Sequence, residues 1–178
     1  MANHHDSLPP LTLVLGGARS GKSAYAESLL SDAKERLYVA TAQAQDGEMR
    51  DRIRRHQARR GAKWVTIEEP IDLVGALSTH CRPDRPALVD CLTLWVTNLM
   101  LGQSLVDQEI DRFLRSLPEF CGPVVFVANE VGLGIVPDNA MARLFRDHAG
   151  RLNQLLAAHC QRVVFVAAGL PLLLKDIR

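Results

Sequence analysis

The chain of 178 residues is 47% hydrophobic and 23% charged, with a formal net charge of +1 at pH 7. Such values are typical of one globular domain with a substantial core, and they argue against a nucleic-acid-binding surface spread over the whole molecule. No apolar run approaches the roughly 20 residues needed to span a bilayer, so we do not expect an integral membrane segment.

The N-terminal segment and the cysteines carry no expected chemistry. Residues 1–10 are polar, with two prolines and no apolar signal segment, so we expect a disordered tail before a single domain at 11–178. The cysteines are far apart and form no Cys-x-x-Cys pair, which argues against a zinc site and a disulfide framework. We expect buried, inert thiols in a reducing, cytoplasmic setting. They are Cys81, Cys91, Cys121 and Cys160.

The first strong motif is a loop for nucleotide phosphates. Residues 11–15 predict a buried strand and residues 23–30 a helix, and the junction between them fits G-x-x-x-x-G-K-[ST]. Glycines let backbone N–H groups approach a polyphosphate, Lys22 can reach the outer phosphates, and the Ser23 hydroxyl can ligate Mg²⁺. The expected phosphate-binding residues are Gly16, Gly17, Ala18, Arg19, Ser20, Gly21, Lys22 and Ser23.

A strongly basic helix is predicted at residues 46–60, after an expected strand at 37–41. On this helix His56 would share one face with Arg52 and Arg60, each one turn away. A cationic field lowers the pKa of a histidine, keeps the imidazole neutral and nucleophilic, and holds an incoming triphosphate. Two interpretations stay open from these residues alone: a nucleophile that attacks phosphorus, or a structural histidine on a solvated basic face.

Two later strands are followed by acids. We predict strands at 63–67, 87–90, 124–128 and 163–167, and helices at 71–79, 106–117 and 139–159. Asp90 ends one short apolar strand, and Glu130 follows another. An acid beside the phosphate loop orients Mg²⁺ in P-loop proteins, so Asp90 is our first candidate for that role and Glu130 the alternative.

The last long helix has a predicted start and a predicted buried face. Asp138 is the candidate N-cap, directly after Pro137. Apolar residues recur at helical spacing, which predicts a core-facing stripe rather than a ligand pocket. The stripe consists of Met141, Leu144, Phe145, Leu152, Leu155 and Leu156.

Alternating strands and helices predict an α/β fold, here a P-loop NTPase-like (RecA-like) three-layer sandwich with a mostly parallel central sheet. The residues alone indicate a P-loop phosphotransferase or NTPase. They do not select the base, because the chain lacks the Asn-Lys-x-Asp element usual in guanine-specific GTPases. A small P-loop kinase without nucleotidyl transfer and a noncatalytic, nucleotide-gated binding module remain alternatives.

Longer motifs point to one family. Besides the loop, they are Tyr38-Val39-Ala40-Thr41-Ala42, Glu48-Met49-x-x-Arg52-Ile53-x-x-His56, Trp64-x-Thr66-x-Glu68-Glu69-Pro70, Asp90-Cys91-Leu92-Thr93-x-Trp95-Val96-x-Asn98, Asn129-Glu130-Val131-Gly132-x-Gly134-Ile135-Val136-Pro137 and Phe145-Arg146-Asp147-x-Ala149-Gly150-Arg151-x-Asn153-Gln154. Together they resemble the adenosylcobinamide kinase/adenosylcobinamide-phosphate guanylyltransferase family over nearly the whole chain.

The resemblance implies a bifunctional enzyme that assembles the nucleotide loop of cobalamin. It would phosphorylate the aminopropanol hydroxyl of adenosylcobinamide with ATP or GTP. It would then transfer GMP from GTP to adenosylcobinamide phosphate and release pyrophosphate. The family's guanylylated histidine matches His56, and the family implies a homotrimer.

The resemblance also implies site residues. Lys22 would assist catalysis by stabilising the departing pyrophosphate, and Ser23 and Asp90 would hold Mg²⁺. Outside the loop, the family's nucleotide-binding positions match Ala40, Thr41, Ala42, Gln57, Ala58, Arg59, Arg60, Glu68 and Asp90.

Overall fold

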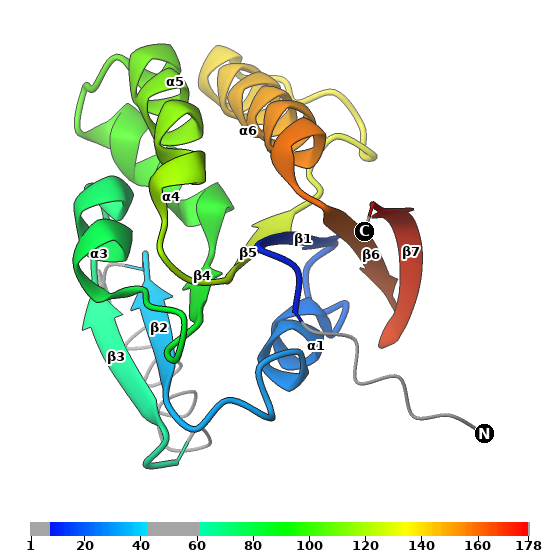
Figure 1. The fold of residues 1–178 in the computed structure, drawn as a ribbon. Helices are drawn as coiled ribbons and strands as arrows, with labels where there is room; N and C mark the ends of the chain where they lie inside the picture. The colour runs from blue at the N-terminus through cyan, green and yellow to red at the C-terminus, as the bar shows by residue number, and fades with distance from the viewer. Residues whose placement is uncertain (1–7, 43–60, 178) are drawn as a thin grey trace.

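The computed structural model describes residues 8–42 and 61–177, which form a seven-stranded sheet with helices on both faces (Figure 1). The strand order is β3-β2-β4-β5-β1-β6-β7. Neighbouring strands pair in parallel except β6 and β7, which are antiparallel. The strands are β1 (Leu11–Gly16), β2 (Arg36–Ala40), β3 (Trp64–Glu68), β4 (Ala87–Asp90), β5 (Val124–Asn129), β6 (Arg162–Ala167) and β7 (Leu170–Asp176).

The described helices divide between the two faces of the sheet. Ala26 of α1 packs with Val14, Val125 and Val127 in one apolar cluster. Helices α3 to α6 pack on the other face, against the alternate residues of the same strands, such as Phe126. The result is a three-layer sandwich, as Figure 1 shows. The helices are α1 (Lys22–Ser28), α3 (Leu73–His80), α4 (Leu92–Leu101), α5 (Val106–Ser116) and α6 (Ala140–His159), with a 3₁₀ turn at Leu117–Glu119.

The carboxyl ends of four neighbouring strands meet at one edge of the sheet. Gly16 of β1 lies opposite Asn129 of β5, and Asp90 of β4 lies opposite Ala40 of β2 and Val127 of β5. Ligands of open α/β sheets bind outside the carboxyl ends of the strands. This edge therefore carries the candidate functional site.

The predicted strands are confirmed, each within one residue at either end. The predicted helix at 46–60 lies outside the described residues. Two elements were not predicted. Six of the ten residues of α4 are buried, among them Thr93 and Asn98, so the helix shows no clear apolar stripe. Strand β7 reads Leu-Pro-Leu-Leu-Leu-Lys-Asp, without the alternation of a half-buried strand.

The predicted start of α6 is wrong by one residue. Asn139, not Asp138, is the N-cap, and its side-chain oxygen accepts a hydrogen bond from the N–H of Ala142 at 2.7 Å. The carbonyl of Asp138 instead accepts a hydrogen bond from the Arg143 guanidinium. Both side chains suit an N-cap, so the sequence does not distinguish the two neighbouring positions.

The prediction of buried positions is wrong for three side chains. Cys121 is exposed, whereas the other cysteines are buried. Met141 and Leu144 are 55% and 51% exposed, because the first turns of α6 lie beyond the main core. Ala149, Leu152 and Leu156, further along the helix, are buried. None of the described helices has the length and apolar character needed to cross a membrane.

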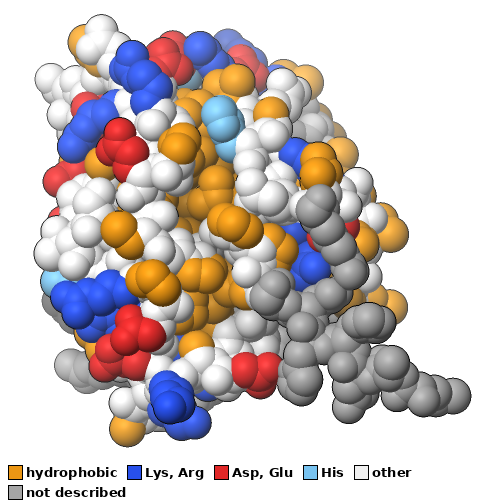
Figure 2. Space-filling view, in the orientation of Figure 1, with side chains coloured by type: hydrophobic (Ala, Val, Ile, Leu, Met, Phe, Trp, Pro, Cys, Tyr) orange, Lys and Arg blue, Asp and Glu red, His pale blue; other side chains and the backbone are white. Residues whose placement is uncertain are grey.

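Charged side chains of both signs lie around the rim of the face shown in Figure 2, and hydrophobic side chains gather in its middle. Mixed charges on this face agree with the net charge of +1. They also agree with the argument against a broad surface for polyanions.

Candidate functional site

The phosphate loop joins β1 to α1 in a conformation that requires its glycines. A Cβ on Gly16 would lie 2.5 Å from both Ser20 Oγ and the Val166 carbonyl oxygen. Gly21 has a φ of +94°, which side chains of L-residues rarely adopt. The carbonyl of Ser20 accepts a hydrogen bond from Gly169 N at 2.8 Å, which ties the loop to the turn after β6. The loop is therefore built before any ligand arrives.

Lys22 is the buried cation of this loop. The residue is 9% exposed, and its Nζ donates a hydrogen bond to the Gly17 carbonyl at 3.1 Å. The ammonium thus lies over the loop that it closes. A phosphate in the loop would offer this ammonium a charged acceptor, which makes a stronger hydrogen bond than a carbonyl.

Asp90 is held in place by Tyr38. The Tyr38 hydroxyl donates a hydrogen bond to Asp90 Oδ2 at 2.9 Å. The Tyr38 ring packs edge-on against Trp64 of β3, with ring centroids 6.0 Å apart. Tyr38 and Leu88 belong to the cluster on the α1 face of the sheet, so the carboxylate of Asp90 lies on the same face as the phosphate loop.

The buried Cys91 thiol follows Asp90 directly, at the start of α4. Burial raises the pKa of the Cys91 thiol to about 11; the charge of Asp90 raises it as well, and the charge of Lys22 lowers it. Both charges therefore act at the start of α4. The two groups come from β4 and from the loop after β1, strands separated in the sheet by β5.

Ser23 and Asp90 suit a magnesium ion. A hydroxyl and a carboxylate are hard oxygen ligands, and Mg²⁺ commonly binds through one or two such groups together with substrate phosphates. In the described part of the chain, no group of three or more His, Cys, Asp or Glu residues could hold a metal. The residues present therefore fit a metal that arrives with a nucleotide.

Thr41, predicted to contact nucleotide, braces the site. It is fully buried. Its hydroxyl donates to the Cys91 carbonyl at 2.8 Å and accepts from Cys91 N at the same distance. Its own carbonyl accepts a hydrogen bond from Asn98 Nδ2 at 2.8 Å. These bonds connect the end of β2 to the start of α4, next to Asp90.

The other predicted residues of β2 and β3 lie at the same edge. Ala40 is buried and pairs with Glu68, which is exposed at the end of the outer strand β3. Ala42 is the last described residue before position 61. His56, Gln57, Ala58, Arg59 and Arg60 lie outside the described residues.

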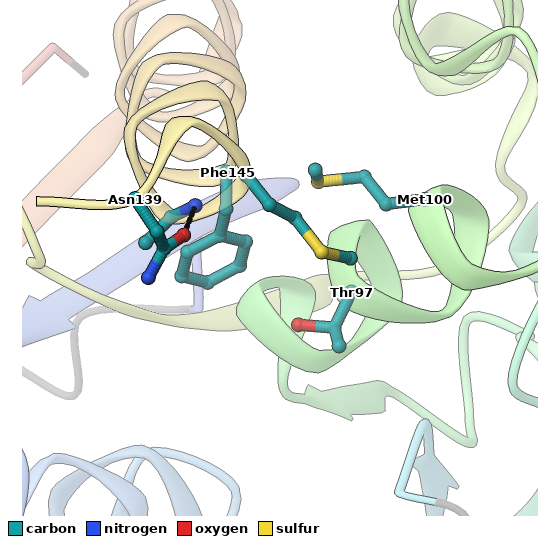
Figure 3. Close-up of a pocket in the computed structure, with 6 residues that line it drawn as sticks. Thr97, Met100, Asn139 and Phe145 are labelled. Atoms are coloured by element: carbon teal, nitrogen blue, oxygen red, sulfur yellow. Dashed lines mark hydrogen bonds between the residues drawn. The ribbon is translucent and has the colours of Figure 1, made fainter. Parts of the chain in front are cut away.

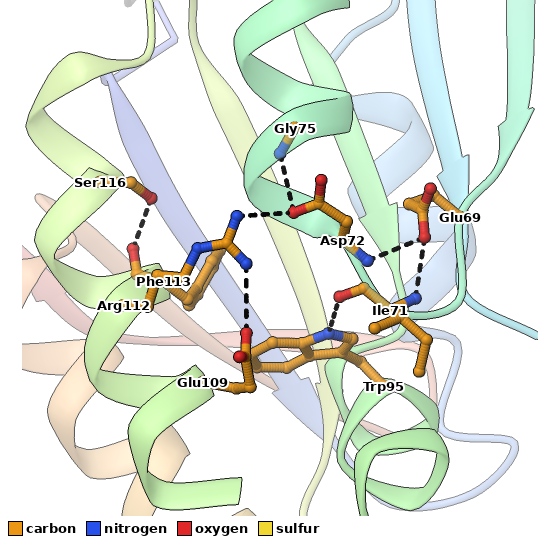
Figure 4. A network of polar contacts seen from close by, with 9 residues as sticks. All are labelled: Glu69, Ile71, Asp72, Gly75, Trp95, Glu109, Arg112, Phe113 and Ser116. Carbon is orange, nitrogen blue, oxygen red and sulfur yellow. Dashed lines mark hydrogen bonds and ion pairs between the residues drawn. The ribbon is translucent and has the colours of Figure 1, made fainter. Parts of the chain in front are cut away.

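A polar network fixes the chain directly after Glu68 (Figure 4). Glu69 Oε1 accepts hydrogen bonds from Ile71 N and Asp72 N at 2.9 and 2.8 Å. Asp72 caps α3 through Gly75 N and pairs with Arg112 of α5 at 3.0 Å. Hydrogen bonds to the carboxylates of Glu109 and Asp72 raise the pKa of Arg112 above its ordinary value.

Sequence reasoning assigned no role to three helix residues, of which two fix the end of β5 and the third fixes the chain after β2 and β3. Thr93 Oγ1 accepts a hydrogen bond from Asn129 N at 2.6 Å, and Asn153 Nδ2 donates to the Asn129 carbonyl at 3.4 Å. Asn98 donates to both Thr41 and Pro70 carbonyls. All three occur in the motifs that carry the family resemblance, and only their presence there marked them in the sequence as candidate site residues.

Glu130, the alternative metal ligand, points elsewhere. Its Oε1 accepts a hydrogen bond from Gly132 N at 2.5 Å, within the loop that follows β5. By the alternation along a strand it lies on the opposite face from Val127 and Asp90. The geometry therefore favours Asp90 for the metal.

A groove of about 260 Å³ lies between α4 and the first turns of α6 (Figure 3). Phe145, predicted to face the core, is half-buried and packs against the main core, and it also lines the groove together with exposed Met141. The residues that line it are Thr97, Met100, Asn139, Met141, Ala142 and Phe145.

Comparison with a protein-family model and with curated relatives points to one family. Residues 12–174 match the family described as cobinamide kinase / cobinamide phosphate guanyltransferase. The chain is 49% identical over 166 residues to the bifunctional adenosylcobalamin biosynthesis protein CobP of Pseudomonas aeruginosa, covering 92% of this chain and 96% of that protein. It is 41% identical over 180 residues to the bifunctional adenosylcobalamin biosynthesis protein CobU of Salmonella typhimurium, covering 93% and 99%.

Solved structures support the fold alone. An ATPase from the type III secretion system of pathogenic bacteria matches with a TM-score of 0.55 at 8% identity, covering 89% of this chain and 51% of that one. A Pyrococcus horikoshii protein matches with a TM-score of 0.53 at 11% identity, covering 96% and 88%. Together with the strand order and the phosphate loop, these matches confirm the RecA-like, P-loop NTPase-like fold.

Proposed function

Because this chain belongs to the cobinamide kinase/cobinamide phosphate guanyltransferase family of bifunctional enzymes, we propose that it catalyses both reactions on adenosylcobinamide. It phosphorylates the aminopropanol hydroxyl with ATP or GTP, and it then transfers GMP from GTP to the new phosphate, releasing pyrophosphate. One observation carries this proposal: the preformed phosphate loop lies on the same face and edge of the sheet as Asp90.

The loop and Lys22 would bind the triphosphate, and Ser23 and Asp90 would hold Mg²⁺. The metal neutralises charge on the phosphates when it is bound. Lys22, released from the Gly17 carbonyl, would stabilise the negative charge that collects on the leaving group. Tyr38 keeps the Asp90 carboxylate oriented on the loop side of the sheet.

The residues beyond the loop suit the nucleoside end of GTP. β3 and β1 are separated by four strand spacings, which is about 19 Å. Glu68 therefore lies beyond the reach of phosphates bound in the loop, and it would contact the sugar or base. Ala40 and Ala42, at the end of the strand beside it, would line the path between, with buried Thr41 holding that backbone in place.

We assign the guanylyl transfer to His56. Its neutral imidazole would attack the α-phosphorus of GTP, forming a P–N bond while the bond to the pyrophosphate oxygen breaks. An oxygen of cobinamide phosphate would then displace the imidazole, forming the P–O bond of the product as the P–N bond breaks. Gln57, Ala58, Arg59 and Arg60, directly after His56, would hold the same nucleotide.

Exposure to GTP followed by mass spectrometry tests this assignment. We expect the denatured protein to carry one added GMP, labile to acid, on His56. His56→Ala should lose the added mass and guanylyl transfer but keep cobinamide phosphorylation by ATP. Unlabelled wild-type protein that still converts cobinamide phosphate and GTP to product would overturn the covalent route.

We also propose that the enzyme acts in the cytoplasm as a homotrimer. Exposed apolar side chains on β7 and on the loop after β5, such as Leu172 and Ile135, support self-association. Light scattering of the purified protein should give three times the chain mass of 19.7 kDa.

A further inference from the structure

Buried polar atoms without partners single out Asn129. Within residues 8–42 and 61–177, three buried side-chain atoms have no hydrogen-bond partner: Thr12 Oγ1, Ser20 Oγ and Asn129 Oδ1. Thr12 is the second residue of β1, near the opposite edge of the sheet, and Ser20 belongs to the phosphate loop. Asn129 ends β5, between the loop strand and the Asp90 strand. A buried acceptor left without a donor costs about 1–3 kcal/mol, so turning the half-buried amide to bring Oδ1 to a ligand donor would remove that cost.

The backbone of Asn129 is fully engaged and fixes the side chain. Its N–H donates to Thr93 Oγ1 and its carbonyl accepts from Asn153 Nδ2. The next N–H, of Glu130, donates to the Gly16 carbonyl at 3.1 Å. Strand β1 and helices α4 and α6 thus hold this strand end in one position.

The side chain of Asn129 belongs to the reactive face of the sheet. Val127 and Val125, two and four residues before it, pack on the α1 face, so Asn129 lies on that face by strand alternation. Gly16, at the start of the phosphate loop, lies directly opposite on β1. Because Gly16 begins the loop whose Lys22 can reach the outer phosphates, Asn129 would lie at the phosphate end of a bound nucleotide.

Three other polar side chains at this edge already have partners. Thr41 is bonded to Cys91, Asn98 to two carbonyls, and Glu130 to Gly132 N. The nucleotide's phosphates are acceptors and give Asn129 Oδ1 no hydrogen. The kinase reaction, however, brings a donor to this place: the hydroxyl that must meet the γ-phosphorus.

We propose that Asn129 positions the acceptor alcohol of the kinase reaction, with Oδ1 accepting the hydroxyl hydrogen so that the oxygen faces the γ-phosphorus. This inference rests on the proposed function. The alcohol oxygen forms a bond to the γ-phosphorus, and the bond from that phosphorus to the bridging oxygen breaks, its electron pair leaving with the nucleoside diphosphate. The amide takes no proton; the proton passes from the alcohol to a phosphoryl oxygen and then to water.

Guanylyl transfer has no such requirement. Its acceptor is a phosphate monoester, which is mainly a dianion at pH 8 and carries no hydroxyl hydrogen for Oδ1. A role of Asn129 in holding Mg²⁺ or the triphosphate would instead affect both reactions, since both use a nucleotide at the loop. Measuring both activities therefore distinguishes a role in positioning the alcohol from a role in binding Mg²⁺ or the triphosphate.

Asn129→Leu removes the acceptor with little change in volume and leaves the backbone bonds in place. We expect kcat for cobinamide phosphorylation by ATP to fall roughly ten- to hundredfold, with the KM for ATP unchanged. Guanylyl transfer from GTP to preformed cobinamide phosphate, followed by pyrophosphate release, should stay within twofold of the wild type. Asn129→Ala, which avoids any clash of the leucine, should show the same split.

Thr12→Val is the matched control, because it removes another buried polar atom without a partner from the same sheet. It should leave both activities unchanged. Equal losses of both activities in the Asn129 variants, or unchanged kinase activity, would overturn the proposal. Wild-type protein that does not phosphorylate cobinamide would instead contradict the proposed function.

Discussion

Side chains at the carboxyl ends of the strands orient one another through hydrogen bonds and ring contacts. Asp90, the expected metal ligand, is oriented by Tyr38, and Tyr38 is in turn packed against Trp64. Each of these residues comes from a different strand, so the sheet register sets the geometry of the proposed metal site. A change that spares the carboxylate but removes its support should therefore change how the enzyme uses Mg²⁺.

Tyr38→Phe tests this support. We expect the Mg²⁺ concentration for half-maximal rate to rise several-fold in both reactions, because the carboxylate loses the hydrogen bond that orients it. The ring contact with Trp64 stays, so the stability loss should be about 1 kcal/mol. Magnesium titrations of each activity measure the effect. Tyr25→Phe, on α1, is the control, and an equal shift there would contradict the assignment.

Thiol reactivity also follows from position. Burial raises the pKa of Cys81 and Cys91 to about 11 and that of Cys160 to about 12. The thiolate is the reactive form, so these three remain neutral thiols at pH 8 and react slowly in the native protein. Exposed Cys121 should be the single thiol per chain that reacts promptly with a disulfide reagent. Unfolding in guanidinium should expose all four, and prompt reaction of Cys91 in the native state would contradict this burial.

At the scale of elements, α4 links three parts of the site. Its Thr93 holds the end of β5, its Asn98 holds Thr41 and Pro70, and its Trp95 donates a hydrogen bond to the Ile71 carbonyl at 2.7 Å. These contacts reach β5, β2 and the turn before α3. The helix after Asp90 is thus a brace for the edge where nucleotide would bind.

Asn98→Leu should weaken this brace. Two carbonyls, of Thr41 and Pro70, lose their donor, and we expect a loss of about 2 kcal/mol in the free energy of unfolding. For a chain of this size that corresponds to a fall of about 6 °C in Tm. Thr97→Ala, whose hydroxyl bonds only within its own helix at Thr93, should lower Tm far less. Equal effects in scanning calorimetry would show that helix α4 does not depend on the Asn98 contacts.

The sequence predicted the strands well because parallel strands buried on both faces read as short apolar runs, as in β1 and β5. It predicted the loop because the phosphate cradle requires fixed residue types at fixed spacing. It missed α4, whose burial on several sides hides the helical period. It also assigned no role to Tyr38 or Thr93, because contacts between distant segments leave no pattern along one stretch of chain.

At the scale of the whole molecule, strand β7 is the unusual surface. It is the outermost strand of the sheet and pairs with β6 on one side (Figure 1). Exposed apolar side chains run along it: Leu170, Leu172, Leu173, Leu174 and Ile177. Unprotected edge strands with apolar side chains favour pairing with another chain, so β7 is our candidate for contact between subunits.

Replacing Leu170 and Leu172 by lysine tests whether β7 assembles the proposed trimer. Each residue is exposed in the single chain, and they face Ala167 and Phe165 across the hairpin, so the fold of one subunit should tolerate the change. Between subunits the new charges would be buried without partners, which opposes assembly. We therefore expect the mass in light scattering to fall from three chains to one, with a far-UV circular dichroism spectrum like that of the wild type. The same double substitution at Leu133 and Ile135, on the loop after β5, is the comparison. If only the loop variant dissociates, the subunits meet through that loop, and β7 has another role.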